Sequence, residues 1–111
     1  MTELTSKHCV PCDGGTAPLN AEATRHLMQK LSLGWQVDAD GKAIRREFSF
    51  KNFYRTMSFV NAVAHIANTE DHHPDLEVGY NYCRIKFSTH AIGGLSENDF
   101  ICAAKIDTLG A

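Results

Sequence analysis

The chain has 111 residues, of which 43% are hydrophobic and 22% charged, and its formal net charge at pH 7 is −2. These proportions are typical of one small globular domain and exclude a chain that is mainly disordered. The slightly acidic balance argues against a sequence-neutral nucleic-acid binder, because that class is normally basic. No run of about 18 apolar residues is present, so we expect no membrane-spanning helix.

Residues 1–18 differ in composition from the rest of the chain. They hold two prolines, a Gly-Gly pair and the motif Cys9-x-x-Cys12, and they show little periodicity. This composition is typical of an irregular segment, so we expect an N-terminal arm over 1–18 and one folded domain over 19–111. The arm lacks the basic-then-apolar pattern of a signal peptide. We therefore expect a cytoplasmic protein whose four cysteines are reduced.

Two helices are predicted in the first two-thirds of the chain. The first begins at Asn20, a favoured N-cap residue, and ends at Gly34, which can adopt the left-handed conformation that terminates helices. The second covers about residues 52–68. Its apolar residues spread over so wide an arc that we expect it to contact both a sheet and a further surface, such as a partner subunit.

Four strands are predicted, two before and two after the second helix. Residues 35–37 and 44–50 form a hairpin around an Asp-Gly turn, and residues 76–80 and 82–89 form the second pair. A third helix begins after Ser96, which opens a pattern like a capping box. The order α-β-β-α-β-β-α predicts an α+β fold, in which three helices pack on one face of a four-stranded antiparallel sheet.

Six histidines are an unusual number for so short a chain. His72 and His73 follow the second predicted helix, and Pro74 forces His73 toward an extended backbone. His90 ends the most clearly alternating strand, just before a Gly-Gly loop, which is a common place for a functional side chain. Because imidazole titrates near neutral pH, these histidines are candidates for acid–base chemistry. A surface histidine pair is the alternative.

Metal binding is a second chemistry open to these residue types. Histidine, together with Asp71 and Asp75, can ligate zinc or iron, but the local spacing fixes no metal geometry. The motif Cys9-x-x-Cys12, with His8 beside it, is half of a zinc site and has no second pair. A zinc site there would need ligands from another subunit, and we predict no metal site.

The remaining histidines and cysteines have structural interpretations. His26 and His65 lie inside predicted helices, where packing or surface roles are the usual ones. Cys83 and Cys102 occupy predicted core positions, where a buried thiol packs as a small apolar group.

Four linked sequence blocks carry a resemblance to a known family. They are Asp71-His72-His73-Pro74-Asp75, Tyr80-Asn81, Ser88-Thr89-His90, and Gly94-Leu95-Ser96-Glu97 with Asp99. Together with the separation of His73 from His90, they resemble the pterin-4a-carbinolamine dehydratases. The resemblance covers about residues 20–108, and the linked blocks are far more specific than a His-His-Pro triplet alone.

The resemblance implies an activity. Enzymes of this family remove water from 4a-hydroxytetrahydropterin to give quinonoid dihydropterin, which regenerates the cofactor of aromatic amino-acid hydroxylases. No metal or organic cofactor is implied. Animal members also act as dimerisation coactivators of a transcription factor, so a non-catalytic binding module on the same fold is the alternative function.

The resemblance also implies roles for single residues. His72 and His90 carry the acid and base roles, in an order that the sequence leaves open, and His73 assists by binding or polarising the pterin. Asp71 is expected to orient an imidazole or raise its pKa. The remaining residues expected to line the pocket or bind the pterin are Trp35, Pro74 and Asp99.

Two positions depart from the family pattern. Asn68 stands where many relatives have an acidic residue, and Leu76 replaces a common aromatic residue. As partners we expect a pterin substrate, further copies of the chain in a homodimer or homotetramer, and an aromatic amino-acid hydroxylase. Direct contact with nucleic acid or membrane is not expected.

Overall fold

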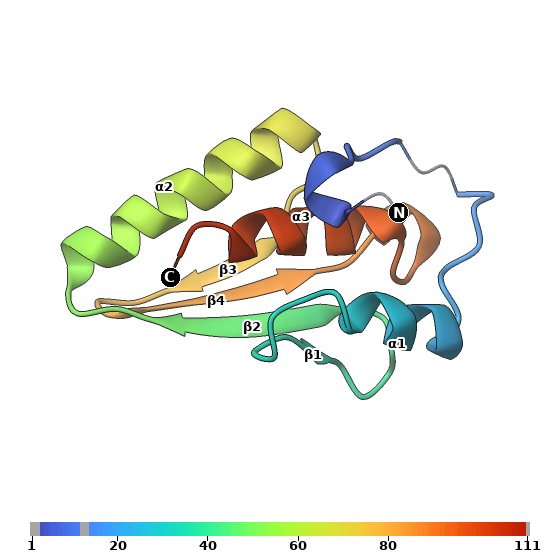
Figure 1. Cartoon of the computed structure of the whole chain (residues 1–111), viewed down its shortest axis with the longest axis horizontal. Helices are drawn as coiled ribbons and strands as arrows, with labels where there is room; N and C mark the ends of the chain where they lie inside the picture. The colour runs from blue at the N-terminus through green and yellow to red at the C-terminus, as the bar shows by residue number, and fades with distance from the viewer. Residues whose placement is uncertain (1–2, 12–13, 111) are drawn as a thin grey trace.

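The computed structural model describes residues 3–11 and 14–110 and contains the predicted helices and strands, with two short 3-10 helices besides (Figure 1). In chain order the elements are η1 (Leu4–Ser6), α1 (Ala21–Met28), β1 (Gln36–Val37), β2 (Ile44–Ser49), α2 (Phe53–Glu70), β3 (Asp75–Val78), β4 (Tyr82–Phe87), η2 (His90–Ile92) and α3 (Glu97–Asp107). The predicted α+β fold class is therefore confirmed.

The four strands form one antiparallel sheet in the order β1-β2-β4-β3. Strand β4 shows the predicted alternation, because Cys83, Ile85 and Phe87 are buried while Arg84 and Lys86 are exposed. The helices cover the apolar face, with α2 and α3 side by side above β3 and β4 (Figure 1). The opposite face carries charged side chains and remains open to solvent.

Helix α3 provides the centre of the hydrophobic core. Eight of its residues are buried, and the largest fully buried side chains include Phe100, Ile101 and Ile106 from α3 and Phe87 from β4. A helix that is buried over most of its surface must lie between other layers. Helix α3 contacts α2, α1 and η1.

Arg46 interrupts the apolar face of β2, and the structure shows how its charge is accommodated. Its Nη1 lies 2.6 Å from Oδ1 of Asp107, and its guanidinium lies 4.2 Å from the ring centroid of Phe48. The same Asp107 oxygen accepts a hydrogen bond of 2.8 Å from the indole Nε1 of Trp35. One carboxylate at the end of α3 therefore pairs with two polar groups, the guanidinium of Arg46 on β2 and the indole N–H of Trp35 just before β1.

The helix boundaries differ from the prediction at two places. Helix α1 ends at Met28, before the predicted Gly34, and a turn follows it. Helix α2 continues to Glu70 and ends at Asp71, which adopts the left-handed conformation (φ 51°). Asp tolerates this conformation better than most residues, so the helix can end there without a glycine.

The N-terminal arm packs against the domain. Leu4 is only 4% exposed and belongs to the hydrophobic core, and η1 lies against α3. The boundary at residue 18 between arm and domain stays a prediction. Cys12, the second cysteine of the predicted half-site, lies outside the described residues.

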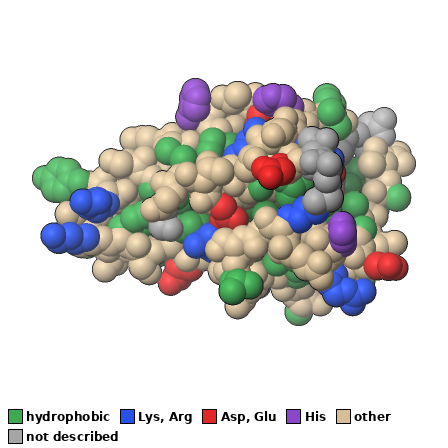
Figure 2. Space-filling view, in the orientation of Figure 1, with side chains coloured by type: hydrophobic (Ala, Val, Ile, Leu, Met, Phe, Trp, Pro, Cys, Tyr) green, Lys and Arg blue, Asp and Glu red, His purple; other side chains and the backbone are tan. Residues whose placement is uncertain are grey.

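No helix in the described part of the chain is long and apolar enough to cross a membrane. On the face of the molecule drawn in Figure 2, acidic and basic side chains both occur and neither kind forms a continuous patch.

Candidate active site

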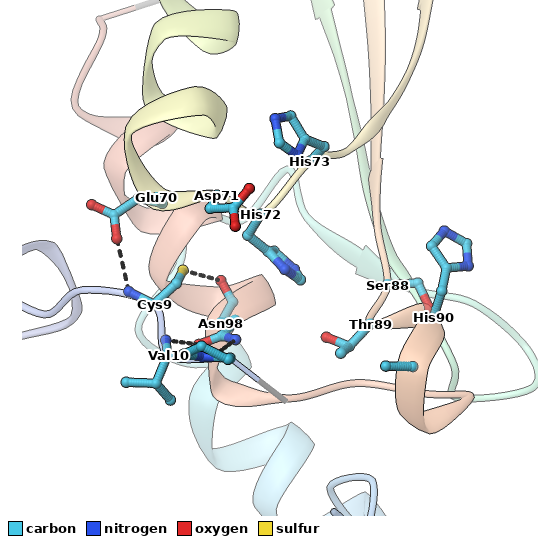
Figure 3. Close-up of a pocket in the computed structure, with 12 residues that line it drawn as sticks. Cys9, Val10, Glu70, Asp71, His72, His73, Ser88, Thr89, His90 and Asn98 are labelled. Atoms are coloured by element: carbon cyan, nitrogen blue, oxygen red, sulfur yellow. Dashed lines mark hydrogen bonds between the residues drawn. The ribbon is translucent and has the colours of Figure 1, made fainter. Parts of the chain in front are cut away.

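A cavity of about 440 Å³ opens where four parts of the chain meet: the arm, the end of α2, the end of β4 and the start of α3 (Figure 3). It is lined by Cys9, Val10, Pro11, Glu70, Asp71, His72, His73, Ser88, Thr89, His90, Ala91 and Asn98. All three histidines that the sequence singled out lie in this lining, although 17 positions separate His73 from His90 in the sequence.

The end of α2 determines where His72 lies. The backbone N–H of His72 donates to the carbonyl of Ala67 at 3.1 Å, across the left-handed Asp71. This is the 6→1 bond of a Schellman motif, which reverses the chain directly after a helix. The reversal brings the side chain of His72 back over the sheet, where it is 12% exposed.

The imidazole of His72 is fixed on two sides. Its Nε2 lies 2.6 Å from Oδ1 of Asp99, and its ring stacks on Phe87 with the centroids 5.9 Å apart and the planes at 7°. An ionised carboxylate only accepts hydrogen bonds, so Nε2 is the protonated nitrogen of this pair. Nδ1 is then the ring nitrogen that can exchange a proton with a bound molecule.

Asp99 is fully buried, and its second carboxylate oxygen is also hydrogen-bonded. Its Oδ2 accepts from the hydroxyl of Thr89 at 2.9 Å and from the backbone N–H of Ser96 at 3.0 Å. The bond from Ser96 belongs to the predicted capping box of α3. Asp99 therefore starts a helix and orients His72 with the same carboxylate.

His73 and His90 are both exposed on the rim of the cavity. Nε2 of His73 lies 3.0 Å from the side-chain oxygen of Asn68. His90 begins η2 just beyond β4, and in Figure 3 it extends from the segment opposite α2. Among the described residues, His72 is the only one of the three that is paired with a carboxylate.

Two other predicted site residues, Trp35 and Pro74, lie outside the cavity lining. Trp35 is 3% exposed and does not line the cavity, because its indole is held in the core by Asp107. It supports the site indirectly, because its ring centroid lies 6.2 Å from that of Phe87, and the ring of His72 stacks on Phe87. Pro74 also lies outside the lining.

Asp71 lines the cavity, but no hydrogen bond links its exposed carboxylate to an imidazole within the described residues. The expected role of Asp71 stays a prediction, and the carboxylate in contact with His72 is that of Asp99. The left-handed backbone of Asp71 ends the helix, and the next residue, His72, enters the cavity lining.

Glu70 also lines the cavity, although it was not among the residues expected there. Its side chain is only 4% exposed and accepts a hydrogen bond of 2.7 Å from the backbone N–H of Cys9. Burial acts to raise the pKa of Glu70, but this bond, the contact with His8 and the charge of Lys105 outweigh it and lower the pKa. The carboxylate is thus kept ionised by the arm.

The thiols of Cys9 and Cys102 lie side by side near the cavity, with their sulfur atoms 3.6 Å apart. The hydrogen bond with Cys9 and burial raise the pKa of Cys102 well above that of a free thiol. Among the described residues, no three His, Cys, Asp or Glu side chains are grouped so that they could hold a metal ion.

Comparison with known proteins gives one consistent result. Residues 17–109 match the sequence model of the pterin 4 alpha carbinolamine dehydratase family. A Legionella pneumophila (strain Corby) protein with that curated name is 61% identical over 108 residues, which cover 97% of this chain and 96% of its own. A Nitrosospira multiformis protein with the same name is 62% identical over 109 residues, covering 98% of this chain and 94% of its own.

Two solved structures share the fold. The crystal structure of a transcriptional coactivator/pterin dehydratase from Brucella melitensis matches with a TM-score of 0.79 and 30% identity, over 85% of this chain and 99% of that one. A pterin dehydratase-like protein identified as a RuBisCO assembly factor in the α-carboxysome matches with a TM-score of 0.61 and 23% identity, over 70% and 90% of the two chains. The second likeness is one of fold alone.

Proposed function

Because the chain belongs to the pterin-4a-carbinolamine dehydratase family, we propose that its histidine-lined cavity removes water from a 4a-hydroxytetrahydropterin by acid–base catalysis. The products are quinonoid dihydropterin and water. The observation that carries this proposal is the pairing of His72 with the buried Asp99, on the inner wall of a cavity that also holds His73 and His90.

The reaction requires two proton transfers. A general acid donates a proton to the hydroxyl on C4a, the C–O bond breaks as a ring-nitrogen lone pair forms a C=N bond, and the oxygen leaves as water. A general base takes the proton from the ring nitrogen, so charge and atoms balance. Groups that titrate near neutral pH perform both steps efficiently.

We assign these two transfers to His72 and His90, and the binding or polarisation of the pterin to His73. His72 is held rigidly by Asp99 and Phe87, which suits a group that must meet one atom of the substrate. The exposed positions of His73 and His90 allow contact with a substrate that enters from solvent. The proposed chemistry needs no metal and no organic cofactor.

The direct test is a dehydration assay with 4a-hydroxytetrahydropterin generated by an aromatic amino-acid hydroxylase. His72→Ala and His90→Ala should each lower kcat by about 10²- to 10⁴-fold, the usual contribution of a general acid or base. His65→Ala, which removes an exposed imidazole from α2 outside the cavity, is the matched control and should leave the rate unchanged.

Unchanged turnover in both His72→Ala and His90→Ala would refute the proposed mechanism. The same assay with a chelator separates the metal alternative, since a strong loss of activity on chelation would favour a metalloenzyme. A binding module is the other alternative, because the Brucella structure's name includes a coactivator role. A wild-type protein that binds partners but shows no turnover would favour that function.

We also propose that the protein is located in the cytoplasm, that it forms a homodimer or homotetramer, and that an aromatic amino-acid hydroxylase is a partner. Support for self-association comes from apolar side chains left exposed on α2 and on the edge strand β3. Phe53 is 47% and Val78 40% exposed, and Tyr80 just beyond β3 is 65% exposed. A monomeric mass in solution at micromolar concentration would contradict the proposed assembly.

A further inference from the structure

The arm contributes three consecutive residues, Cys9, Val10 and Pro11, to the cavity lining. In Figure 3, Cys9 and Val10 lie on one side of His72, and Ser88, Thr89 and His90 lie on the other. A molecule bound in this cavity would therefore contact the arm as well as the histidines.

Two buried side chains hold this part of the arm in place. Asn98, which is 5% exposed, accepts from the N–H of Val10 at 3.1 Å and donates through Nδ2 to its carbonyl at 2.6 Å. Glu70 accepts from the N–H of Cys9. Asn98 thus bonds to both the N–H and the carbonyl of Val10, as a neighbouring strand would. These two bonds fix the backbone of Val10 and do not involve its side chain.

Asn98 and Glu70, which hold the arm, are close in sequence to Asp99 and His72. Asn98 precedes Asp99 on α3, and Glu70 lies two residues before His72. The position of the arm relative to His72 is thus determined through very short stretches of chain. A wall positioned in this way can present a side chain to substrate with little conformational freedom to lose.

Among the arm residues that line the cavity, Val10 carries an exposed aliphatic side chain. It is 64% exposed at the edge of a cavity whose opposite side carries Ser88, Thr89 and His90. An exposed aliphatic side chain gains free energy when an apolar or aromatic surface covers it. The flat ring system of a pterin, or the substituent that it carries, offers such a surface.

We propose that Val10 is a substrate-contacting residue of this enzyme and that Asn98 is the positioning residue that holds it against the bound pterin. The inference rests on the proposed function, since it takes the pterin as the molecule that fills the cavity. It assigns to the arm a share in substrate affinity, while proton transfer stays with the histidines.

The test compares Val10→Ala with the matched control Val37→Ala, an exposed valine of β1 outside the cavity. Binding of 7,8-dihydrobiopterin, a stable pterin probe, is measured by calorimetry beside the dehydration assay. Val10→Ala should raise the Kd of the probe and the KM about three- to tenfold, as expected for losing part of one apolar contact, with kcat nearly unchanged. The control should match wild type.

The role of Asn98 is tested by a double-mutant cycle. Asn98→Ala should raise the Kd of the probe at least as much as Val10→Ala, and adding Val10→Ala to it should cause little further loss, because Asn98 acts through Val10. Additive losses in the double variant would overturn the positioning role. A purely structural effect of Asn98→Ala on stability would not produce that lack of additivity.

The outcomes separate this inference from the proposed function. If wild type turns over the substrate and Val10→Ala binds the probe as wild type does, the arm inference is wrong and the enzyme assignment stands. If wild type binds the probe but does not turn over, and Val10→Ala weakens binding, the inference stands and the proposed reaction fails. A wild type that neither binds the probe nor turns over overturns both.

Discussion

Nε2 of His72 lies 2.6 Å from Oδ1 of Asp99, and that carboxylate has no exposed surface. The pair joins the segment directly after α2 to the first turn of α3. In the sequence, His72 and Asp99 are 27 positions apart. A buried carboxylate that holds an imidazole fixes its tautomer and its orientation, as an acid–base catalyst requires.

Asp99→Asn should lower kcat about ten- to hundredfold with a small change in KM, because an amide keeps one acceptor but supplies no charge to His72. The measurement is steady-state dehydration kinetics, with urea denaturation in parallel because Asp99 also belongs to the capping box. Asp75→Asn, which changes an exposed carboxylate at the start of β3, is the matched control. A variant that folds and keeps wild-type kcat would contradict the role of Asp99.

The contact between Asn68 and His73 gives a second prediction. The side-chain oxygen of Asn68 is a neutral acceptor that lies 3.0 Å from Nε2 of His73. We expect Asn68→Ala to raise KM severalfold by releasing His73, and Asn68→Asp to keep KM near the wild-type value. Equal kinetics in wild type and Asn68→Ala would show that this contact has no part in binding.

The third prediction concerns pH and the arm. The lowered pKa of Glu70 means that the folded state favours its ionised form more than the unfolded state does. Its contribution to stability is therefore fully present above the unfolded value of about 4.5 and is lost as the pH falls through the lower folded value. Three partners lower the pKa of Glu70: the backbone N–H of Cys9 and the side chains of His8 and Lys105.

Glu70→Gln should accordingly be less stable than wild type from neutral pH down to about pH 4.5, and the difference should shrink as the pH falls further. Urea denaturation at a series of pH values measures it. Glu77→Gln, an exposed carboxylate on β3, serves as the control. The measurements cover roughly three pH units, from pH 6 downward. If the difference in unfolding free energy between Glu70→Gln and wild type stays constant over this range, the stabilising role of ionised Glu70 is disproved.

The cysteines report on the docking of the arm. The pKa of Cys102 is raised by its hydrogen bond with Cys9 and by burial, and burial raises that of Cys83. Because the thiolate is the reactive form, both should resist iodoacetamide at pH 8 in the native protein. In Asn98→Ala, loosening of the arm should speed alkylation of Cys102 while leaving Cys83 protected, as peptide mass mapping can determine. Equal rates at both thiols would indicate global unfolding.

Sequence patterns determined the elements that depend on local chemistry. The alternation of β4 and the start of α3 at Ser96 follow from the period of side chains along a strand and from capping preferences, and both were predicted correctly. The histidines of the cavity were also found by sequence, with His72, His73 and His90 in the lining. That these three histidines meet in one cavity was implied only by the family resemblance, because their positions in the sequence do not give the distances between them in space.

The buried face of α2 was decided by tertiary packing. The sequence shows a broad apolar arc, in which Phe53 and Val60 belong to one stripe that Phe59 and Val63 widen. In the structure Phe59 and Val63 are buried, while Phe53 is 47% exposed. Hydrophobic periodicity defines an arc, and only the position of the sheet and of α3 selects its centre.

The sequence by itself determined the element order, the sheet and the three candidate histidines, because these follow from periodicity, capping and residue chemistry along the chain. Only the tertiary structure decided which side chains support them: Asp99 rather than Asp71 beside His72, Trp35 in the core beneath Phe87, and the arm as a wall held by Asn98. Each of these contacts joins distant residues, and their distances depend on how the helices pack on the sheet.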